Sequence, residues 1–550
     1  MTRFALALAL VVGLLATGTP AATVPASSPA IRLDSVGYLP RAPKVASLAT
    51  NAVRFTAVRT DNGQIALTGS PRGPVTNPDT GESLWLADFS ALDQPGEYRL
   101  EADGLPPSAT FRIDAQVYHE PFRVVVRGMY LWRCGTAVHG NHHGQTFAHG
   151  PCHLEDAWLD FVGQPGERVD ATGGWHDAGD YNKYVVNAGV TVGAMLRAWE
   201  DFEPAVRQVP LNLPEAGQPA PEFLAELRWE LDWLLKMQRA DGSAYHKLST
   251  TNFGGFILPD LEKSRRYMTP VGTAATADLV AMLAQASRVF RSVDPDRAAK
   301  YLDAAQRGRA FLRAHPEDLR PNLAGFTTGG YGTRDPDDRL WAAAELWETT
   351  GDPESLADLE NRIREAQGKF DTDFDWGNVR NLGLITYLRS GKSGRDAALL
   401  GLVRSNLIAT ADGIVATAQR HGYGRPLGDR YYWGCNGSVA RQTLPLMAAH
   451  RLTGNAAYRN TALDALHHLL GRNVFGRSTI TGLGHRPPQF PHDRRSGGDN
   501  VNDPWPGYLV GGPNPGAADW NDDQKDFRTN EIAINWNGAL IYALAAALAP

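Results

Sequence analysis

The sequence predicts a mainly helical protein, an (α/α)6 barrel preceded by a small all-β, Ig-like sandwich. Short runs of β-branched and aromatic residues, separated by turn residues, fill the first part of the chain after residue 30. After residue 114 the apolar residues recur at helical spacing, in about twelve stretches. Twelve helices paired as six hairpins form a double ring, and the loops at one mouth of such a ring build a cleft.

The N-terminus is typical of an export signal. Arg3 supplies a positive charge, residues 4–16 are apolar, and small residues continue to Ala22. We therefore expect a signal peptide over residues 1–22, a Pro/Ser-rich linker over 23–30, and a secreted protein that is extracellular or periplasmic. The apolar run is too short to span a bilayer and no later run is long enough, so we expect no membrane association.

The segment 31–115 is predicted to be the Ig-like β-sandwich domain. The turn signals Asp61-Asn62-Gly63 and Gln94-Pro95-Gly96 separate its apolar runs. Six or seven short strands in so small a segment are typical of an Ig-like sandwich, and no catalytic constellation is visible in it. The expected strands are 31–39, 44–48, 55–60, 84–89, 98–101 and 110–113.

The segment 116–550 is predicted to be the barrel domain. Phe223, Leu227, Leu231 and Leu234 lie on one face of an amphipathic helix, and similar patterns recur along the domain. The expected helices are 121–134, 182–201, 220–239, 273–290, 297–314, 338–350, 353–367, 377–390, 397–419, 438–453, 456–471 and 531–549.

Composition narrows the class of partner. The formal net charge of -6, with 21% charged residues, provides no basic field for nucleic acid. Fourteen tryptophans suit a neutral, sugar-like substrate, because an indole packs well on apolar ring faces. We expect a monomer with no nucleic-acid partner.

The stretch 173–184, GGWHDAGDYNKY, contains two carboxylates three residues apart, Asp177 and Asp180, with aromatics on both sides. A helix is expected from residue 182, so Asp180 is predicted to lie on the turn that enters it. Free N–H groups and the dipole there would lower the pKa of Asp180 and keep it available as a base. The alternative is that Asp180 only caps the helix and Asp177 is a loop aspartate.

A long connection over residues 476–530 has little helical pattern, and loops of this length in a compact domain are usually functional or disordered. It contains His492 and Arg494, and Glu531 is predicted to open the helix that follows. This composition indicates that the connection forms one wall of a functional site, although a solvated loop is the alternative.

Together these residues resemble glycoside hydrolase family 9, mostly cellulolytic inverting hydrolases with an (α/α)6 barrel often preceded by an Ig-like module. The resemblance runs from GGWHDAGDYNKY to TNEIAINWNGALIYALA. The segment 478–494 is similar to the family's histidine signature and 520–537 to its acidic signature. Gly538 stands where the family usually has Ser, Thr or Ala.

The resemblance implies a role for each matching residue. Asp180 matches the general base, Asp177 the carboxylate that helps it hold water, and Glu531 the general acid. An inverting glycosidase needs an acid and a base roughly 6.5–9.5 Å apart with opposite pKa shifts, and apolar residues after Glu531 suggest a desolvated, protonated acid. His492 and Arg494 match substrate-binding positions. Further substrate-binding candidates are Trp376, Trp433, Tyr181 and His246, for which a core position is the alternative.

Three cysteines, Cys134, Cys152 and Cys435, are an odd count for an exported protein. A Cys134–Cys152 disulfide with one buried thiol is one possibility. The resemblance favours another, because the Ig-bearing branch of the family has a structural zinc whose ligands correspond to Cys134, Cys152, His153 and His176. Such a metal would pin the loop that carries Asp177.

The segment 331–338 resembles a calcium loop of the family, with Asp337 and Asp338 as candidate ligands. The same acids also fit the start of a helix. No organic cofactor is expected.

These observations predict a secreted endo-β-1,4-glucanase that cleaves cellulose or soluble β-glucans with inversion. An exo-acting member, such as a cellobiohydrolase, β-glucosidase or exo-β-glucosaminidase, is the alternative within the family. A non-catalytic carbohydrate-binding protein and an (α/α)6 lyase or epimerase are more distant alternatives. No cellulose-binding module follows the last predicted helix, so we expect poor action on crystalline cellulose.

Overall fold

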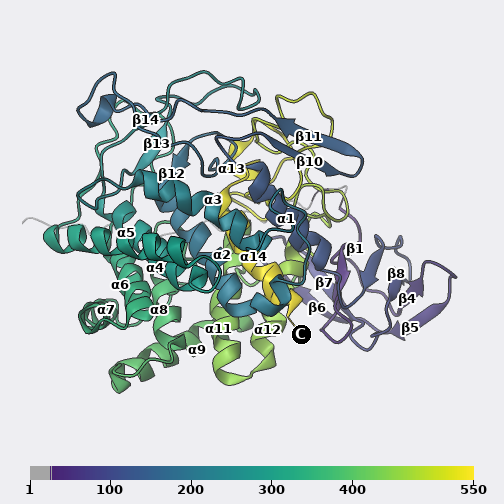
Figure 1. Cartoon of the computed structure of the whole chain (residues 1–550). Coiled ribbons are helices and arrows are strands. Elements are labelled where there is room, and N and C mark those ends of the chain that lie inside the picture. Colours follow the sequence, from purple (N-terminus) through teal and green to yellow (C-terminus); the bar gives the residue numbers. More distant parts are fainter. Residues whose placement is uncertain (1–24, 26–27, 550) are drawn as a thin grey trace, which may run out of the picture.

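The computed structural model describes residue 25 and residues 28–549. The predicted signal peptide therefore lies outside the described residues, as does half of the predicted linker. Figure 1 shows a small β-domain, formed by the N-terminal part of the chain, beside a larger helical domain.

The β-domain is a sandwich of two sheets, with strand orders β1-β3-β7-β6 and β2-β9-β8-β4-β5. Its core is built from alternate strand residues, with Tyr38 packed edge-on against Phe89 and Phe111. The expected strand 31–39 is two strands, one in each sheet. The exposed strands β5 and β6, each at the edge of a different sheet, were not predicted. Most of their side chains face solvent, so their hydrophobic alternation is weak. The strands are β1 Ile31–Arg32, β2 Gly37–Tyr38, β3 Val45–Leu48, β4 Phe55–Arg59, β5 Ile65–Gly69, β6 Arg72–Thr76, β7 Ser83–Asp88, β8 Gly96–Ala102 and β9 Phe111–Ile113.

The helical domain is the predicted (α/α)6 barrel. The inner ring runs from α14 through α2, α4, α6 and α8 to α11 and α10, which packs on α14. The outer ring contains α1, α3, α5, α7, α9 and α12. The helices are α1 His119–Leu131, α2 Val185–Val206, α3 Glu222–Met237, α4 Thr273–Phe290, α5 Pro295–Ala314, α6 Pro336–Thr350, α7 Pro353–Glu365, α8 Arg380–Arg389, α9 Ala397–Arg420, α10 Cys435–Arg441, α11 Thr443–Thr453, α12 Ala456–Leu469, α13 Phe527–Asn530 and α14 Ile534–Leu548.

Two predicted helix starts near the site are wrong. α2 begins at Val185, because Lys183 and Tyr184 form the extended strand β12. α14 begins at Ile534, because Glu531 and Ile532 make β-bridges to other loops. In both places tertiary pairing outweighs helical propensity. The expected helix 438–453 is also divided, at Gln442, into α10 and α11.

The loops gather at the mouth where the inner helices begin, and Figure 1 shows them along one side of the helices. They include the hairpin of β10 (Val138–His142) and β11 (Gln145–His149), and a three-stranded sheet of β12 (Lys183–Tyr184), β13 (Lys247–Ser249) and β14 (Tyr267–Met268). The long connection between α12 and α13 crosses the same mouth. Loop residues from distant parts of the chain are thereby brought together.

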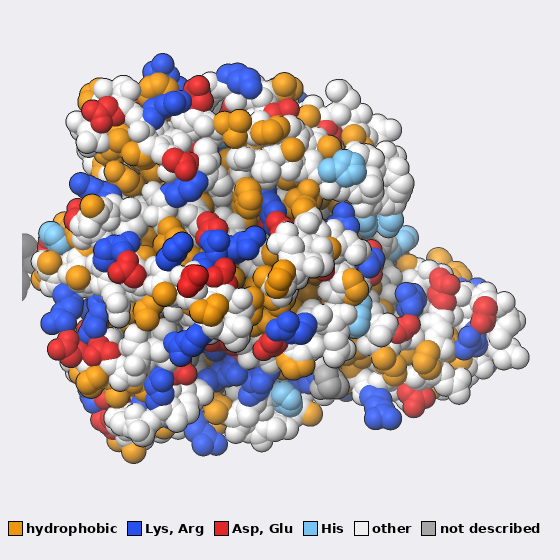
Figure 2. Space-filling view, viewed as in Figure 1, with side chains coloured by type: hydrophobic (Ala, Val, Ile, Leu, Met, Phe, Trp, Pro, Cys, Tyr) orange, Lys and Arg blue, Asp and Glu red, His pale blue; other side chains and the backbone are white. Residues whose placement is uncertain are grey.

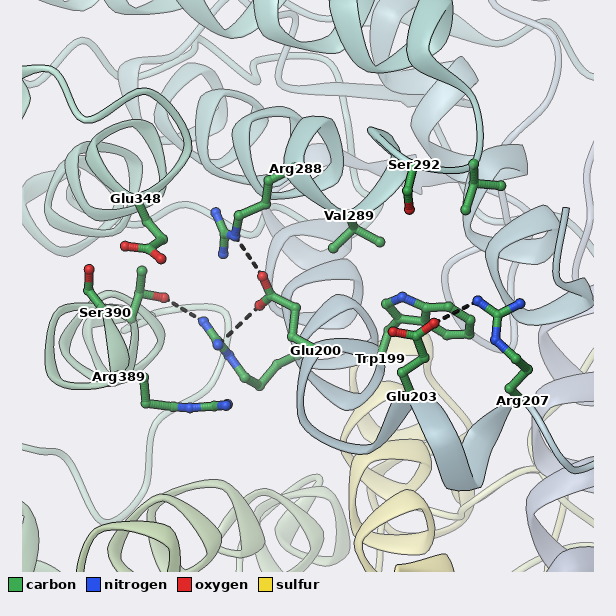
Figure 3. Close-up of a pocket in the computed structure, with 13 residues that line it drawn as sticks. Trp199, Glu200, Glu203, Arg207, Arg288, Val289, Ser292, Glu348, Arg389 and Ser390 are labelled. Carbon is green, nitrogen blue, oxygen red and sulfur yellow. Dashed lines mark hydrogen bonds and ion pairs between the residues drawn. The ribbon is translucent and has the colours of Figure 1, made fainter. Parts of the chain in front are cut away.

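The opposite mouth is closed by ion pairs at the C-terminal ends of inner helices. A cavity of about 430 Å³ lies there, lined by parts of α2, α4, α6 and α8. Figure 3 shows Glu200 facing Arg288, with an Nε–Oε1 distance of 2.6 Å. Nη1 of Arg197 lies 3.0 Å from the other carboxylate oxygen of Glu200. Cationic side chains at helix C-termini complement the helix dipoles, so this cluster has a structural explanation.

Polar contacts join the β-domain to the barrel. Asp79 accepts hydrogen bonds from Nε2 of His421 (3.1 Å) and from the hydroxyl of Tyr431 (2.5 Å). Asn77 accepts from the backbone N–H of Gly422 at 2.7 Å. Tyr431 lies two residues before Trp433, so the β-domain supports a loop at the barrel mouth.

Charges of both signs are interspersed over the face seen in Figure 2. Among the described helices, α9 has the length and hydropathy that a membrane span would need, and a third of that stretch is buried inside the protein. It packs in the outer ring against α11 and α12.

Candidate active site and metal site

A cleft of about 620 Å³ opens at the loop-covered mouth. It brings together seven residues that the sequence singled out: Asp177, Asp180, Glu531, His492, Arg494, Trp376 and Trp433. Five separate segments between helices and strands supply them, which no local pattern could place side by side. The remaining lining residues are Ala178, Tyr184, Phe253, Gly329, Gly330, Tyr331, Asp375, Phe527, Ala533, Asn535 and Trp536.

Backbone pairing holds the two carboxylate-bearing segments together. Ala178 and Ala533 form an antiparallel bridge, and the N–H of Ile534 donates to the carbonyl of Asp177 at 2.8 Å. His492 and Glu531 form a parallel bridge on the other side. Main-chain hydrogen bonds therefore hold the segments around Asp177 and Glu531 in a fixed alignment, which keeps the side chains of both residues over the same cleft.

Asp177 is buried and doubly hydrogen-bonded. Its Oδ1 accepts from the amide of Asn187 on α2, and its Oδ2 accepts from the hydroxyl of Tyr331, both at 2.7 Å. Burial, followed by the negative charge of Asp180, raises the pKa of Asp177 to about 8.

Asp180 is 5% exposed and accepts from the amide of Asn182 at 2.6 Å. The predicted lowering of its pKa by a helix terminus is wrong, because extended residues separate it from α2. Burial raises the pKa of Asp180, while the charge of Arg494 and the hydrogen bond from Asn182 act in the opposite direction. Arg494 thus supplies the stabilisation that was expected from the helix.

Glu531 has extended backbone just before α14. Burial, and then the charges of Asp180 and Asp177, raise its pKa well above the usual range. The cleft therefore combines Glu531, whose pKa is raised well above its usual range, with Asp180, whose raised pKa is opposed by the charge of Arg494. The expected opposite pKa shifts are not found, because burial raises the pKa of both groups, yet the two environments still favour Glu531 as the acid and Asp180 as the base.

His492 and Arg494 form one side of the cleft. Nδ1 of His492 donates to the carbonyl of Gln524 at 2.7 Å, and burial lowers the pKa of the ring, so Nε2 is left as an acceptor. Arg494 donates from Nη1 to the carbonyl of Gly179 (2.8 Å) and from Nε to that of Gly254 (3.0 Å). Arg494 is therefore fixed against the backbone between the two aspartates.

Aromatic rings line the rest of the cleft. Trp433 is 48% exposed and lies 5.3 Å from the ring of Phe527, so it is not a core tryptophan. Trp376 is half-buried and packs edge-on against Tyr331 at 5.0 Å. Phe253 is 48% exposed under the guanidinium of Arg494. Such rings suit the apolar faces of sugars.

Two candidates do not line the cleft. Tyr181 is buried, and its ring lies 4.8 Å from that of His176, beside the cysteine and histidine cluster. His246 is buried behind the cleft wall, with Nε2 2.6 Å from the carbonyl of Gly330. Conversely, Tyr331 and Phe253 were not predicted as site residues. Tyr331 lies in the segment assigned to calcium, and Phe253 lies in a loop without any motif.

Cys134, Cys152, His153 and His176 form the single cluster of possible metal ligands found among the described residues, with ligand atoms all within 4.8 Å of one another. All three cysteines are free, so the alternative disulfide is not formed in this structure. Two thiols and two imidazoles are the donor set of a closed tetrahedral site for a soft or borderline metal. His176 immediately precedes Asp177, so the cluster lies next to the segment that carries Asp177 and Asp180.

Asp337 and Asp338 have different partners. Oδ2 of Asp337 accepts from the backbone N–H of Val379 at 2.7 Å. Asp338 is buried beside Asp278, and burial, together with the charge of Asp278, raises its pKa well above the usual range. A proton shared with the neighbouring carboxyl of Asp278 gives Asp338 a hydrogen-bond partner.

Comparison with known proteins matches both domains. Residues 118–544 match the model of glycosyl hydrolase family 9, and residues 26–106 match that of the cellulase N-terminal Ig-like domain. Endoglucanase D of Acetivibrio thermocellus is 51% identical over 518 residues, covering 94% of this chain and 83% of that protein.

Solved structures show the same fold. A metagenome-derived glycoside hydrolase family 9 endoglucanase superposes with a TM-score of 0.89 at 34% identity, covering 94% of this chain and 99% of that one. A Zn-binding triple mutant of the family 9 endoglucanase J30 superposes with a TM-score of 0.87 at 33% identity, covering 93% and 99%. With its barrel, its Ig-like domain and its carboxylate-lined cleft, the chain belongs to glycosyl hydrolase family 9.

Proposed function

We propose that the protein is an endo-β-1,4-glucanase that hydrolyses cellulose and soluble β-glucans with inversion of configuration. The observation that carries this proposal is the meeting of Asp177, Asp180 and Glu531 in one aromatic-lined cleft. The 51% identical relative is named an endoglucanase, which supports the substrate class.

Glu531 acts as the general acid. It gives its proton to the glycosidic oxygen as the bond from that oxygen to the anomeric carbon breaks. Its raised pKa keeps the proton available at neutral pH. Loss of this proton leaves Glu531 ionised, and solvent restores it after the product leaves.

Asp180 acts as the general base. A water molecule attacks the anomeric carbon from the face opposite the leaving group, and Asp180 takes its proton. The charges of Arg494 and Lys247 favour the ionised form of Asp180 against the effect of burial. Asp177 helps to hold the water, and its hydrogen bonds from Asn187 and Tyr331 fix its orientation.

Trp376 and Trp433 serve as platforms for glucose rings, and His492 and Arg494 bind sugar hydroxyls. Nε2 of His492 is available as an acceptor, and Nη2 of Arg494 is the donor that can reach a sugar hydroxyl, since its Nε and Nη1 already donate to backbone carbonyls. Tyr181 and His246 lie behind the cleft wall and support it without contacting the substrate.

The Cys/His cluster holds a structural zinc ion through Cys134, Cys152, His153 and His176. The donor chemistry supports this assignment, and the four candidate ligand atoms lie within 4.8 Å of one another, close enough to share one ion. Four protein ligands leave no open position, so the ion takes no part in the hydrolysis. Its role is to hold the segment 173–184 in place.

Two further assignments rest on sequence. Asp337 and Asp338 are proposed calcium ligands, because two acidic side chains in the segment 331–338 offer the oxygen donors that calcium prefers. Residues 1–22 are proposed to direct export. An enzyme whose substrate is a polymer too large to enter a cell has to act outside it.

The test is product analysis over time on carboxymethyl cellulose, mixed-linkage β-glucan and chitosan, with viscosity followed beside reducing ends. An endo-acting enzyme lowers viscosity quickly while few new ends appear. Slow viscosity loss with one small product, or release from chitosan alone, would assign the protein to the exo-acting alternative. Asp180→Asn, verified as folded, is the control for background hydrolysis.

A further inference from the structure

The imidazole of His153 faces the Cys/His cluster with one nitrogen and a buried carboxylate with the other. Nδ1 lies 3.7 Å from Sγ of Cys134, while Nε2 lies 3.2 Å from Oε2 of Glu262. The side chains of His153 and Glu262 are 2% and 6% exposed. A metal-bound imidazole commonly donates its remaining N–H to a carboxylate, which sets the tautomer and the ring orientation. In contrast, Nδ1 of the other ligand, His176, is buried without a hydrogen-bond partner among the described residues.

The same carboxylate packs against the backbone of the cleft-wall loop, residues 250–262. A Cβ added to Gly254 would lie 2.0 Å from Oε1 of Glu262, so only glycine leaves room for the carboxylate there. The carbonyl of Gly254 accepts from Nε of Arg494, whose Nη1 donates to Gly179, between Asp177 and Asp180. Phe253, next to Gly254, lines the cleft.

We infer that Glu262 is a positioning residue that couples metal occupancy of the Cys/His cluster to the shape of the cleft wall beside Asp180. With a metal bound, the N–H at Nε2 of His153 donates to Glu262 and fixes its carboxylate. The carboxylate in turn keeps Gly254, Phe253 and Arg494 in their positions. Without the metal, the orientation of His153 is no longer fixed. The loop 250–262 then loses the hydrogen bond that holds Glu262 in place. The inference rests on the proposed zinc site and glucanase activity, and it concerns substrate binding rather than the chemical step.

Adjacent glycines provide a matched pair of variants. Gly254→Ala forces the Glu262 carboxylate away from its position, whereas Gly255 has no atom within 4 Å of an added Cβ. Neither glycine has a positive φ, so alanine fits both backbones. Glu262→Ala removes the carboxylate, and Glu262→Gln keeps an oxygen that can accept from His153.

The first readout is zinc loss to a chelator from the zinc-loaded full-length protein, followed with a colorimetric indicator and checked by elemental analysis. We expect Glu262→Ala and Gly254→Ala to lose zinc at least about tenfold faster than the unmodified protein, because removing a carboxylate that supports a metal-bound histidine typically costs 10–100-fold in affinity. Glu262→Gln should be intermediate and Gly255→Ala unchanged. KM for soluble β-glucan should rise severalfold in the two alanine variants that disturb Glu262, with kcat nearly constant.

The second readout is amide hydrogen exchange of peptides from residues 250–263, with and without zinc. Zinc removal should accelerate exchange there in the unmodified protein, and Glu262→Ala should exchange rapidly in both states. Unchanged exchange after zinc removal, equal behaviour of the two glycine variants, or failure of the unmodified protein to retain zinc would each overturn the inference. An unmodified protein that binds zinc but cleaves no β-glucan would instead refute the proposed function, since zinc loss and exchange need no activity.

Discussion

The hydroxyl of Tyr331 donates a 2.7 Å hydrogen bond to Oδ2 of Asp177, and the same ring packs edge-on against Trp376 at 5.0 Å. One side chain thus connects Asp177, one of the three carboxyl groups of the proposed active site, to an aromatic wall of the cleft. Tyr331 holds this position with a φ of 44°, in a region that non-glycine residues seldom adopt. It contributes to both the chemistry and the shape of the site.

Tyr331→Phe should lower kcat on β-glucan by roughly 2- to 10-fold at neutral pH, because Asp177 is then mostly protonated and a hydrogen bond to a neutral group is worth about 0.5–1.5 kcal/mol. Loss of a hydrogen bond that favours ionised Asp177 raises its pKa further, so the acidic limb of the pH–kcat profile should move to higher pH. Steady-state kinetics from pH 4 to 9 measure both effects. An unshifted profile with normal kcat would mean that this hydroxyl is only structural.

The activities of Asp180→Asn and Glu531→Gln should depend differently on the leaving group of the substrate. Each variant should lose at least about 100-fold of its activity on β-glucan, the usual range for removing an acid or base. An aryl cellobioside with an acidic phenol departs without protonation, so Glu531→Gln should retain much of its activity on that substrate while Asp180→Asn should not. Equal losses on both substrates by Glu531→Gln would contradict its role as the acid.

Asp177→Asn should stabilise the fold at alkaline pH while it removes activity. The folded-state pKa of about 8 lies above the reference value of 3.8, so the folded protein keeps a proton that the unfolded chain loses. Stability therefore falls as pH rises from about 4 to 8, and asparagine abolishes this loss. The melting temperature of the variant should exceed that of the parent at pH 8 and approach it near pH 4. A difference that is independent of pH would argue against a raised pKa.

Cys152→Ser should release the metal, lower the melting temperature and reduce activity, because a thiolate ligand of the cluster is lost. Cys435→Ser is the matched control, since Cys435 is also buried but its thiol lies 3.3 Å from the carbonyl of Pro513, outside the cluster. Zinc content by elemental analysis and melting temperature should separate the two. Equal zinc content in both variants would exclude this cluster as the site.

Asp79→Ala should weaken substrate binding although Asp79 lies in the β-domain. Its carboxylate accepts from Tyr431, two residues before the platform Trp433, so its loss frees the loop. We expect a KM several times higher and a lower melting temperature. Tyr431→Phe should reproduce the KM effect, and Asp103→Ala, which removes an exposed aspartate of the same domain, should change neither quantity. A KM effect from Asp103→Ala would point to a general defect of the domain.

The fold class was predictable because it depends on periodicity. Alternation in residues 31–114 and helical spacing beyond them predict the sandwich and the barrel, and the structure confirms both. The strands β5 and β6 escaped prediction because exposed edge strands have little hydrophobic alternation. The starts of α2 and α14 were placed too early, because residues 183–184 and 531–532 pair with other loops, and local propensity contains no information about those partners.

By itself, the sequence determined the barrel, its Ig-like module, the resemblance to the family and the candidates Asp177, Asp180, Glu531 and the Cys/His cluster, because motifs and periodicities are local properties of a chain. Only the tertiary structure decided which candidates share the cleft, that Tyr181 and His246 lie behind its wall, and that Arg494 rather than a helix end faces Asp180. The physical reason is that burial and long-range contacts set the pKa values and the geometry, and these arise only when loops far apart in the chain meet.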